Sequence, residues 1–470
     1  MTEQVKFGTD GWRAVIAENY TFFNVRRAAL ATAKRFKDHA KIKNGIIIGY
    51  DTRFLSKEFA AAVAEVFGNE GIKVFLTSTF VTTPTVSLLA RDKDLAMGVM
   101  ITASHNPAIY NGYKLKDEFG GSMDPDIIVT IEKELINIPS VECKKPLQEL
   151  LDSGIVEYFD GYGYYISYLK SHIDIAEINK AGLKVVYDCM YGAGQNSLGQ
   201  IISSDLKNLH NEVNPGFGKN APEPVEKNLS EIKETIKNGK YNIGIVTDGD
   251  ADRIAIIDEN GDFLDAQKTF ALLLKFLYEN KKMTGKVVRG FSTSELIKKY
   301  CEKNGLELAT VPIGFKHISK MMINEDVMIG AEESGGIGIK GHLPERDGVY
   351  NGLLYLELIA MSGKSISQLK DELDNEFGKY FYQRKDVHTT NEKKQAALDK
   401  CKGLKSGDEI GGRKIISVDP LDGYKFYFEG GWILVRASGT EPLLRIYCET
   451  TVTDQTEEVL NNTINNFNLK

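Results

Sequence analysis

Short apolar runs alternate with amphipathic stretches along this chain, and no other feature constrains its fold as strongly. Residues 45–50, 97–101 and 243–246 are apolar runs of strand length, whereas residues 21–38 form a helix-like stretch that Thr21 can cap. Strands that alternate with helices are typical of α/β folds, in which helices cover mostly parallel sheets. The sequence therefore predicts an α/β protein.

The chain is also too long for one hydrophobic core. With 470 residues, three or four domains are expected. Successive groups of strand and helix patterns divide the chain into four parts, and the last part begins with a helix at 366–377 and ends with one from about Thr453. The predicted domains are residues 1–145, 146–253, 254–368 and 369–470.

Composition limits the classes of partner and the compartment. The formal net charge of −7 argues against nucleic acid or an anionic membrane as the main partner, because such binders are usually basic. No run of 18 apolar residues predicts a membrane span, and the N-terminus shows no signal-peptide pattern. The five cysteines are odd in number and widely spaced, which indicates free thiols in a reducing compartment. We therefore expect a cytoplasmic protein.

The segment Thr102-Ala103-Ser104-His105-Asn106-Pro107 directly follows an apolar run. Asn-Pro favours a turn, so the strand would end by presenting the hydroxyl of Ser104, with the imidazole of His105 beside it. Taken alone, this pair is equally consistent with a turn serine and a histidine that is satisfied by the backbone.

A second polar cluster, Asp248-Gly249-Asp250-Ala251-Asp252-Arg253, lies 144 residues further along the chain. Three carboxylates at alternate positions in a tight loop can converge on a hard cation such as Mg²⁺. One alternative is an EF-hand loop, but the sixth position of such a loop requires Gly and is Arg253 here, and the flanking segments resemble strands and not helices. A second alternative is a solvated acidic loop that binds no metal. Arg253 could pair with a phosphate oxygen or neutralise the acids. A presented serine plus a divalent metal suggests phosphoryl chemistry on Ser104.

Further loops carry residues suited to a phosphorylated ligand. Lys114, in a Gly-containing loop, could act as an acid or base if neighbouring cations lowered its pKa. Arg13 lies in a glycine-rich segment with an acid, and Arg53 follows a strand end, where α/β proteins place ligands. The segment 330–336 carries an acid and a hydroxyl two residues apart, which can hydrogen-bond to neighbouring hydroxyls of a sugar. The segment 436–442 carries an arginine, two hydroxyls and free backbone N–H groups, which together can bind a phosphate. Taken alone, these two are also consistent with a Gly-rich turn and a polar hairpin turn.

Four of these motifs together resemble the α-D-phosphohexomutase family, which includes phosphoglucomutase, phosphomannomutase and phosphoglucosamine mutase. They are TASHNP, DGDADR, the E-x-S-G segment at 332–335 and RASGTEP, in the order of the family, and the resemblance extends from Phe7 to about Tyr447. It implies four domains around a central cleft: three related α/β mixed-sheet units and a smaller α+β C-terminal domain.

The resemblance also implies the reaction. Such an isomerase interconverts hexose 1-phosphate and hexose 6-phosphate through a phosphoserine and a hexose 1,6-bisphosphate, which also serves as activator, with Mg²⁺ as cofactor. The partner would be a small-molecule sugar phosphate, and the enzyme would be a monomer or a homodimer. The implied catalytic residues are Ser104, His105, Lys114 and Arg13. The implied metal ligands are Asp248, Asp250, Asp252 and the phosphate of Ser104. The implied substrate-binding residues are Gly314, Glu332, Ser334, Arg346, Arg436, Ser438, Gly439, Thr440, Arg445 and Arg253.

The residue after the E-x-S-G segment bears on substrate choice. The mannose/glucose and glucosamine enzymes of the family usually have His there, whereas this chain has Gly336. We therefore expect a preference for glucose phosphates. The alternatives are a phosphomannomutase or phosphoglucosamine mutase of the same family, a phosphatase that transfers the phosphoryl group to water, and a non-catalytic sugar-phosphate sensor.

Overall fold

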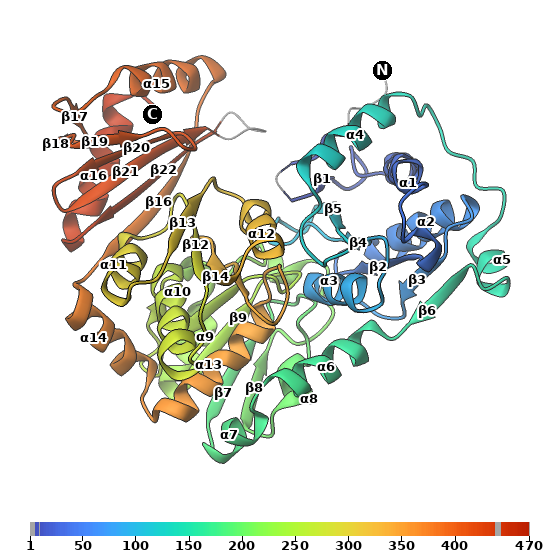
Figure 1. The fold of residues 1–470 in the computed structure, drawn as a ribbon, viewed down its shortest axis with the longest axis horizontal. Helices are drawn as coiled ribbons and strands as arrows, with labels where there is room; N and C mark the ends of the chain where they lie inside the picture. The colour runs from blue at the N-terminus through green and yellow to red at the C-terminus, as the bar shows by residue number, and fades with distance from the viewer. Residues whose placement is uncertain (1–4, 9, 438–442, 470) are drawn as a thin grey trace. The chain divides into compact units, whose positions relative to one another are not determined.

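The computed structural model describes residues 5–8, 10–437 and 443–469, and Figure 1 shows its ribbon. These residues form two compact units. The first comprises the residues up to 284 together with 314–367, and the second comprises 285–313 together with the chain from 368 onwards. Each unit has its own buried hydrophobic core.

The first sheet of the first unit has six strands in the order β1-β5-β4-β2-β3-β6. β4, β2, β3 and β6 are parallel, whereas β5 and β1 run antiparallel to their neighbours. β2 is buried along its whole length, as expected for a strand covered on both faces. Thr21 accepts a hydrogen bond from Asn24 N and so begins helix α1 where the sequence predicts it. The elements are β1 (Trp12–Val15), α1 (Phe22–Phe36), η1 (Ile42–Asn44), β2 (Ile46–Tyr50), α2 (Ser56–Asn69), β3 (Val74–Thr77), α3 (Thr83–Asp92), β4 (Gly98–Ile101), β5 (Tyr110–Lys116), α4 (Pro125–Ile136), α5 (Leu147–Asp152) and β6 (Val156–Phe159).

The second sheet has the order β11-β10-β9-β7-β8. β8, β7 and β9 are parallel, and β9, β10 and β11 are antiparallel. The predicted domain boundary after residue 145 precedes β6, although β6 pairs with the first sheet. The predicted boundary after residue 253 lies between β9 and β10, which pair with each other in the second sheet. The elements are α6 (Gly161–His172), α7 (Ile175–Lys180), β7 (Lys184–Asp188), α8 (Ser197–Ile201), β8 (Asp205–Leu209), η2 (Phe217–Lys219), η3 (Glu226–Asn228), α9 (Ser230–Gly239), β9 (Ile243–Thr247), β10 (Ile254–Ile257), β11 (Phe263–Leu264), α10 (Ala266–Lys275) and η4 (Phe276–Asn280).

The remainder of the first unit contains an antiparallel hairpin and two helices. The hairpin turn carries the E-x-S-G segment between its strands. The elements are α12 (Phe315–Asn324), β14 (Val327–Ala331), β15 (Ile337–Ile339) and α13 (Gly348–Ser362). α13 is buried over most of its length, because apolar residues occupy nearly all of its faces.

The second unit contains the parallel pair β12 and β13 and an antiparallel sheet in the order β16-β22-β21-β20-β19. The antiparallel sheet and its helices form the smaller α+β C-terminal domain that the sequence implies. The first strand of the antiparallel sheet, β16, begins at Phe381. The elements are β12 (Lys286–Gly290), α11 (Glu295–Asn304), β13 (Leu308–Val311), α14 (Ile366–Phe377, which crosses the division between the units), β16 (Phe381–His388), α15 (Asn391–Gly403), β17 (Glu409–Ile410), β18 (Arg413–Lys414), β19 (Ser417–Asp419), β20 (Tyr424–Phe428), β21 (Gly431–Ala437), β22 (Leu443–Thr450) and α16 (Thr453–Asn466).

The α/β prediction is confirmed, including its mixed sheets. β4, β2, β3 and β6 are parallel, as are β8, β7 and β9, whereas β5, β10 and β15 return as antiparallel neighbours. Among the described helices, none combines the length and the apolar character that crossing a bilayer requires.

Candidate active site

Ser104 lies in the loop between β4 and β5, as its place after an apolar run predicts. Its side chain is buried, with 1% exposure, and its backbone adopts φ = +51°, in the left-handed region that non-glycine residues rarely occupy. Ser104 Oγ donates a hydrogen bond of 2.9 Å to Asp248 Oδ2. The hydroxyl is therefore directed at the acidic loop of another sheet.

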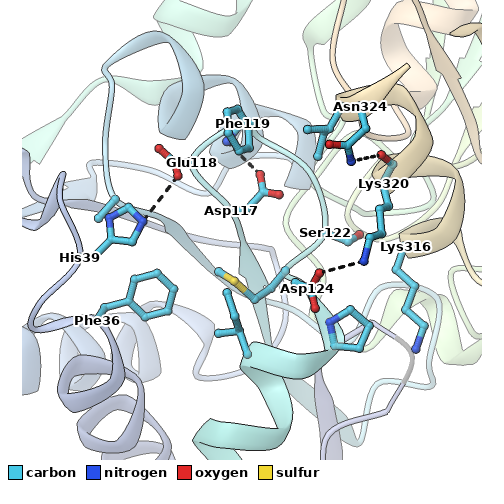
Figure 2. A pocket seen from close by; sticks show the side chains of 15 residues that line it. Phe36, His39, Asp117, Glu118, Phe119, Ser122, Asp124, Lys316, Lys320 and Asn324 are labelled. Atoms are coloured by element: carbon cyan, nitrogen blue, oxygen red, sulfur yellow. Dashed lines mark hydrogen bonds and ion pairs between the residues drawn. The ribbon is translucent and has the colours of Figure 1, made fainter. Parts of the chain in front are cut away.

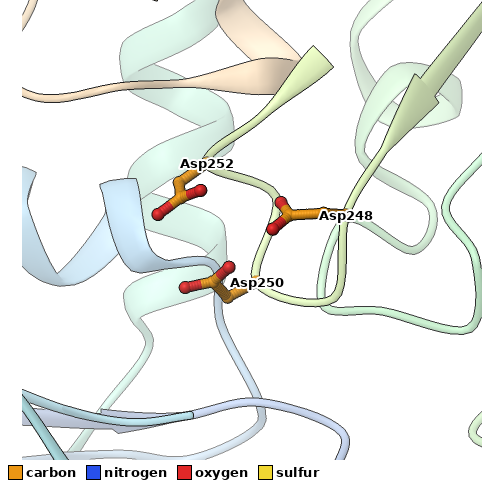
Figure 3. Close-up of side chains that lie close together, drawn as sticks. All are labelled: Asp248, Asp250 and Asp252. Atoms are coloured by element: carbon orange, nitrogen blue, oxygen red, sulfur yellow. The ribbon is translucent and has the colours of Figure 1, made fainter. Parts of the chain in front are cut away.

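The three aspartates come from the tight loop between β9 and β10. All three are fully buried, and one carboxylate oxygen from each lies within 4.8 Å of the others; Figure 3 shows the three side chains around one loop. Asp250 Oδ1 and Asp252 Oδ1 are buried without a hydrogen-bond partner among the described residues. Buried carboxylate oxygens without partners are costly unless they bind a cation, so this donor set fits a hard divalent metal. The EF-hand alternative is wrong, because the flanking elements are strands.

Lys114, on β5, lies against the same acids. Its Nζ is 2.8 Å from Asp250 Oδ2, 3.1 Å from Asp252 Oδ2 and 2.9 Å from Asp10 Oδ2. Burial disfavours the ammonium, but these three carboxylates outweigh burial and raise the pKa of Lys114 above its ordinary value. The condition under which Lys114 could act as an acid or base, a pKa lowered by neighbouring cations, is therefore not met, since its closest charged neighbours are acids.

Arg346 precedes helix α13 and is buried, with 4% exposure. Its Nη2 donates to Asp10 Oδ2 and to Asp252 Oδ2, both at 2.7 Å, and its Nη1 lies 3.5 Å from Glu332 Oε2. Glu332 is buried, which raises its pKa to about 7 although Arg346 opposes that shift. Arg346 thus joins the acidic loop to the hairpin turn that carries Glu332.

Arg13 and His105 complete the cationic and titratable groups around Ser104. Arg13 Nη1 donates to Asn106 Oδ1 at 2.8 Å, so the arginine is held by the serine loop. His105 Nδ1 lies 3.4 Å from Ser104 Oγ. Burial, with Arg253 and Arg13 nearby, holds the pKa of His105 well below its ordinary value, so its imidazole is neutral at pH 7.

Arg253 contributes through its backbone. Its N–H donates to Asp248 Oδ1 at 3.1 Å, whereas its guanidinium lies 4.0 Å from Glu223 Oε1. Within the described ranges no ion pair joins this guanidinium to the three aspartates, and the direct ion pairs come from Lys114 and Arg346. Burial raises the pKa of Asp248, and the charge of Arg253 opposes that rise without a direct contact.

The hairpin turn between β14 and β15 carries Glu332 and Ser334. Glu332 N donates to Gly336 O at 3.0 Å, which closes the turn. A side chain at Gly336 would begin 2.3 Å from Arg346 Cδ, so the space beside the turn already belongs to Arg346. Gly314, with φ = +127°, directly precedes α12 in a different part of the unit.

Two residues of the predicted phosphate loop lie in the second unit. Arg436 on β21 is the cross-strand partner of Arg445 on β22. Arg436 Nε donates to both carboxylate oxygens of Asp422 at 3.0 Å, and Asp422 Oδ2 also accepts from Ile313 N at 2.9 Å. Ser438, Gly439 and Thr440 lie outside the described residues.

Several contacts escaped the sequence analysis. Asp10 Oδ2 lies within 2.9 Å of both Lys114 Nζ and Arg346 Nη2. In the sequence, Asp10 is marked only by its place in a glycine-rich segment that also carries an arginine. Thr83 Oγ1 donates to Asp250 Oδ2 at 2.5 Å, with no sequence signal beyond its place at the start of α3. Arg53, expected to face a ligand, is buried and donates to backbone carbonyls of the serine loop.

A separate cavity of about 330 Å³ opens between the end of α1, the 117–125 segment and α12. Figure 2 shows its lining, in which Lys320 pairs with Asp124 and His39 faces Glu118. None of the predicted catalytic or metal-binding residues lines this cavity.

Known proteins resemble this chain over nearly its whole length. Four family models match consecutive parts of the chain: phosphoglucomutase/phosphomannomutase alpha/beta/alpha domain I at residues 4–142, domain II at 163–261, domain III at 265–377 and the C-terminal domain at 386–465. A phosphoglucomutase/phosphomannomutase of Thermococcus kodakarensis is 30% identical over 459 residues, which cover 97% of this chain and 96% of that protein. A phosphoglucosamine mutase of Methanococcus maripaludis is 31% identical over 462 residues, with 97% and 96% covered. The crystal structure of a Thermus thermophilus protein, provisionally described as a phosphomannomutase, superposes with a TM-score of 0.87 at 30% identity and covers 100% of both chains.

A four-domain chain of this kind, with a serine directed at a loop of three acids that could hold a metal ion, is an enzyme of the phosphohexomutase class, and such enzymes are isomerases. The chain belongs to the phosphoglucomutase/phosphomannomutase family.

Proposed function

We propose that this phosphohexomutase interconverts hexose 1-phosphate and hexose 6-phosphate, with glucose preferred, through phosphorylated Ser104 and a hexose 1,6-bisphosphate. The observation that carries the proposal is the hydrogen bond of 2.9 Å from Ser104 Oγ to Asp248, one of three converging buried carboxylates. A hydroxyl at such a cluster supports phosphoryl transfer on Ser104, because this chemistry depends mainly on position and charge.

Mg²⁺ is the proposed metal, held by Asp248, Asp250 and Asp252 together with the phosphate of Ser104. The unpartnered carboxylate oxygens and the all-oxygen donor set support this choice. When bound, Mg²⁺ supplies positive charge that stabilises the transferring phosphoryl group.

The phosphoryl transfer balances in two steps. In the first, a sugar hydroxyl oxygen bonds to the phosphorus of phospho-Ser104 while the bond to Ser104 Oγ breaks; the sugar hydroxyl loses its proton and Ser104 Oγ gains one. In the second, the bisphosphate has turned around, and Ser104 Oγ bonds to the phosphorus of its other phosphate while the bond from that phosphorus to the sugar oxygen breaks; Ser104 loses its proton and the sugar oxygen gains one. Of the predicted proton-transfer residues, neutral His105 can accept a proton, whereas Lys114 and Arg13 carry charge that favours the phosphate oxygens.

The substrate would be held at two further places. Glu332 and Ser334 would bind sugar hydroxyls, with Gly314 near the sugar. Arg346 and Arg253 would face the phosphate or sugar from the side of the acidic loop. The second phosphate would lie against Arg436 and Arg445, with Ser438, Gly439 and Thr440, in both orientations of the sugar.

Gly336 supports the glucose preference. Arg346 fills the place where a side chain at 336 would begin, so the hairpin turn presents a backbone and an arginine where the mannose/glucose and glucosamine enzymes usually have a histidine. A phosphomannomutase or phosphoglucosamine mutase is the second candidate, favoured by the names of the relatives from Thermococcus kodakarensis and Methanococcus maripaludis.

Turnover of glucose 1-phosphate, mannose 1-phosphate and glucosamine 1-phosphate, measured with Mg²⁺ and hexose 1,6-bisphosphate, separates these candidates. We expect the highest kcat/KM for glucose 1-phosphate, and an equal or higher value for another sugar would overturn the preference. Ser104→Ala should abolish turnover, whereas Ser87→Ala, at another buried serine, should not. Mass spectrometry should locate one phosphate on Ser104. Retained turnover in Ser104→Ala would refute the mechanism, and release of inorganic phosphate faster than isomer formation would indicate a phosphatase.

A further inference from the structure

Arg53 lies under the loop that presents Ser104 and is buried, with 3% exposure. Its Nη2 donates to Ser104 O at 2.5 Å and to Asn106 O at 2.6 Å, and its Nη1 donates to Pro107 O at 2.9 Å and to Tyr110 O at 3.1 Å. One guanidinium therefore binds four carbonyls of a single loop. The planar fork of arginine suits this task, whereas a lysine ammonium offers only one nitrogen.

The amide of Ser104 is fixed by the same group of residues. Ser104 N donates to Thr102 Oγ1 at 2.8 Å, and Thr102 Oγ1 donates to Asp51 Oδ2 at 2.5 Å. Asp51 Oδ2 in turn lies 3.2 Å from Arg53 Nε. The contacts thus run from the N–H of Ser104 through Thr102, Asp51 and Arg53 back to the carbonyl of Ser104.

This closed chain of contacts surrounds an unfavourable backbone. Ser104 has φ = +51°, which side-chain-bearing residues adopt only when their surroundings hold them there. The same carbonyl oxygen is also closely packed against the acidic loop, since a side chain at Gly249 would begin 2.4 Å from Ser104 O. The cation is itself held in place, because its guanidinium carbon lies 4.8 Å from the ring centre of Phe217.

We propose that Arg53 is a positioning residue that, through Thr102 and Asp51, fixes the direction in which Ser104 Oγ points at the metal-binding aspartates. This inference rests on the proposed function, in which Ser104 carries the phosphoryl group. The guanidinium hydrogen bonds of Arg53 go to the backbone carbonyls of residues 104, 106, 107 and 110, so we expect it to act on the serine and not on the substrate. Its loss should therefore change the chemical step and leave substrate affinity in place.

Arg53→Lys tests this directly. We expect kcat to fall on the order of 100-fold, because an error of about 1 Å in a reacting group costs about that much, while KM stays within about twofold. The second readout is the fate of the phosphoryl group. Protein phosphorylated with glucose 1,6-bisphosphate is mixed with glucose 1-phosphate, and the phosphate transferred to sugar is compared with the phosphate released to water. If the phosphate on Ser104 is misdirected, a larger share of the phosphoryl groups should be released to water than in the wild type. A variant that only destabilises the folded protein would not change this share.

Arg27→Lys is the matched control. Arg27 is also buried and also donates to backbone carbonyls, but these belong to Leu135 and Ile138, at the end of α4 and just after it, and not to the serine loop. This variant should retain the wild-type kcat and the wild-type share of phosphate released to water. The same partition change in Arg27→Lys would show a general effect of removing a buried guanidinium and would overturn the proposal.

Thr102 supplies a second test if Arg53→Lys fails to fold. Thr102→Ser keeps the hydroxyl and should behave like the wild type, whereas Thr102→Val removes it and should reproduce the loss in kcat. A kcat within about threefold of the wild type in both Arg53→Lys and Thr102→Val, or a rise in KM with unchanged kcat, would refute the positioning role. If the wild type itself carries no phosphate on Ser104 during turnover, the proposed function fails, and this inference fails with it.

Discussion

Gly336→Ala should disturb the active site through Arg346. An added Cβ at 336 would lie 2.3 Å from Arg346 Cδ and 2.9 Å from its Cγ. Restoring an ordinary contact of at least 3.4 Å requires Arg346 Cδ to move by about 1.1 Å. The arginine cannot yield without cost, because Asp10 and Asp252 each hold its Nη2 at 2.7 Å. Alanine itself is compatible with the backbone here, since Gly336 does not have a positive φ.

A displacement of this size should lower kcat/KM for glucose 1-phosphate by about 100-fold, which corresponds to about 2.7 kcal/mol of transition-state stabilisation. Initial rates with saturating Mg²⁺ and hexose 1,6-bisphosphate measure this loss. Gly199→Ala is the control, because the nearest atom to its added Cβ would be 3.5 Å away, and it should retain wild-type rates.

A double-mutant cycle separates collision with Arg346 from any other effect of the substitution. In an Arg346→Ala background the atoms that an alanine at 336 would strike are absent, so Gly336→Ala should cost less than about twofold there. An equal loss in both backgrounds, or wild-type kcat/KM in the single Gly336→Ala variant, would refute the assignment of that space to Arg346.

Three further outcomes follow from the structure. Asp422→Asn should raise KM for hexose phosphates about tenfold in steady-state kinetics, because Arg436 loses the carboxylate that holds its Nε; a fall in kcat alone would contradict this. Burial lowers the pKa of Lys425 to about 7, so between pH 7 and 10 the unfolded chain binds more protons than the folded chain, and the free energy of unfolding should rise with pH by at most about 1.4 kcal/mol per pH unit. Urea unfolding at pH 7, 8 and 9 should show this slope, and Lys425→Met should lose it. Asp250→Asn should weaken Mg²⁺ binding at least about tenfold by calorimetry, and equal affinity would place the ion elsewhere.

The fold was largely predictable because its signals are local. Thr21 caps α1, and the apolar runs at 45–50, 97–101 and 243–246 become β2, β4 and β9 within a residue. The direction of the strands was not predictable in the same way. β5 pairs antiparallel with β4 because the connection between them is only a short loop, whereas parallel neighbours need a helix-length crossover. The apolar pattern of a strand alone does not show whether its neighbour in the sheet is parallel or antiparallel.

The residue types of the site were predictable, but their contacts were not. Ser104 and Asp248 stand out as members of short motifs, yet nothing in either motif states that their side chains lie 2.9 Å apart across 144 residues. Lys114 illustrates the consequence. From the motif alone, a lowered pKa would have required neighbouring cations. In the fold the closest charged neighbours are acids from separate segments, and against the effect of burial they raise the pKa of Lys114.

Asp10 shows why an inventory of motifs understates this site. Its carboxylate accepts from Arg346 and pairs with Lys114, and it lies 3.8 Å from Arg13, so one acid orients three of the cations that the proposed reaction uses. Burial opposes its charge, but Lys114, Lys116 and Arg346 together hold its pKa well below the ordinary value. A carboxylate that stays ionised can fix several neighbouring cations while offsetting only one of their charges. The arrangement of charge around Ser104 is thus set by an acid that is neither a predicted metal ligand nor a predicted substrate contact.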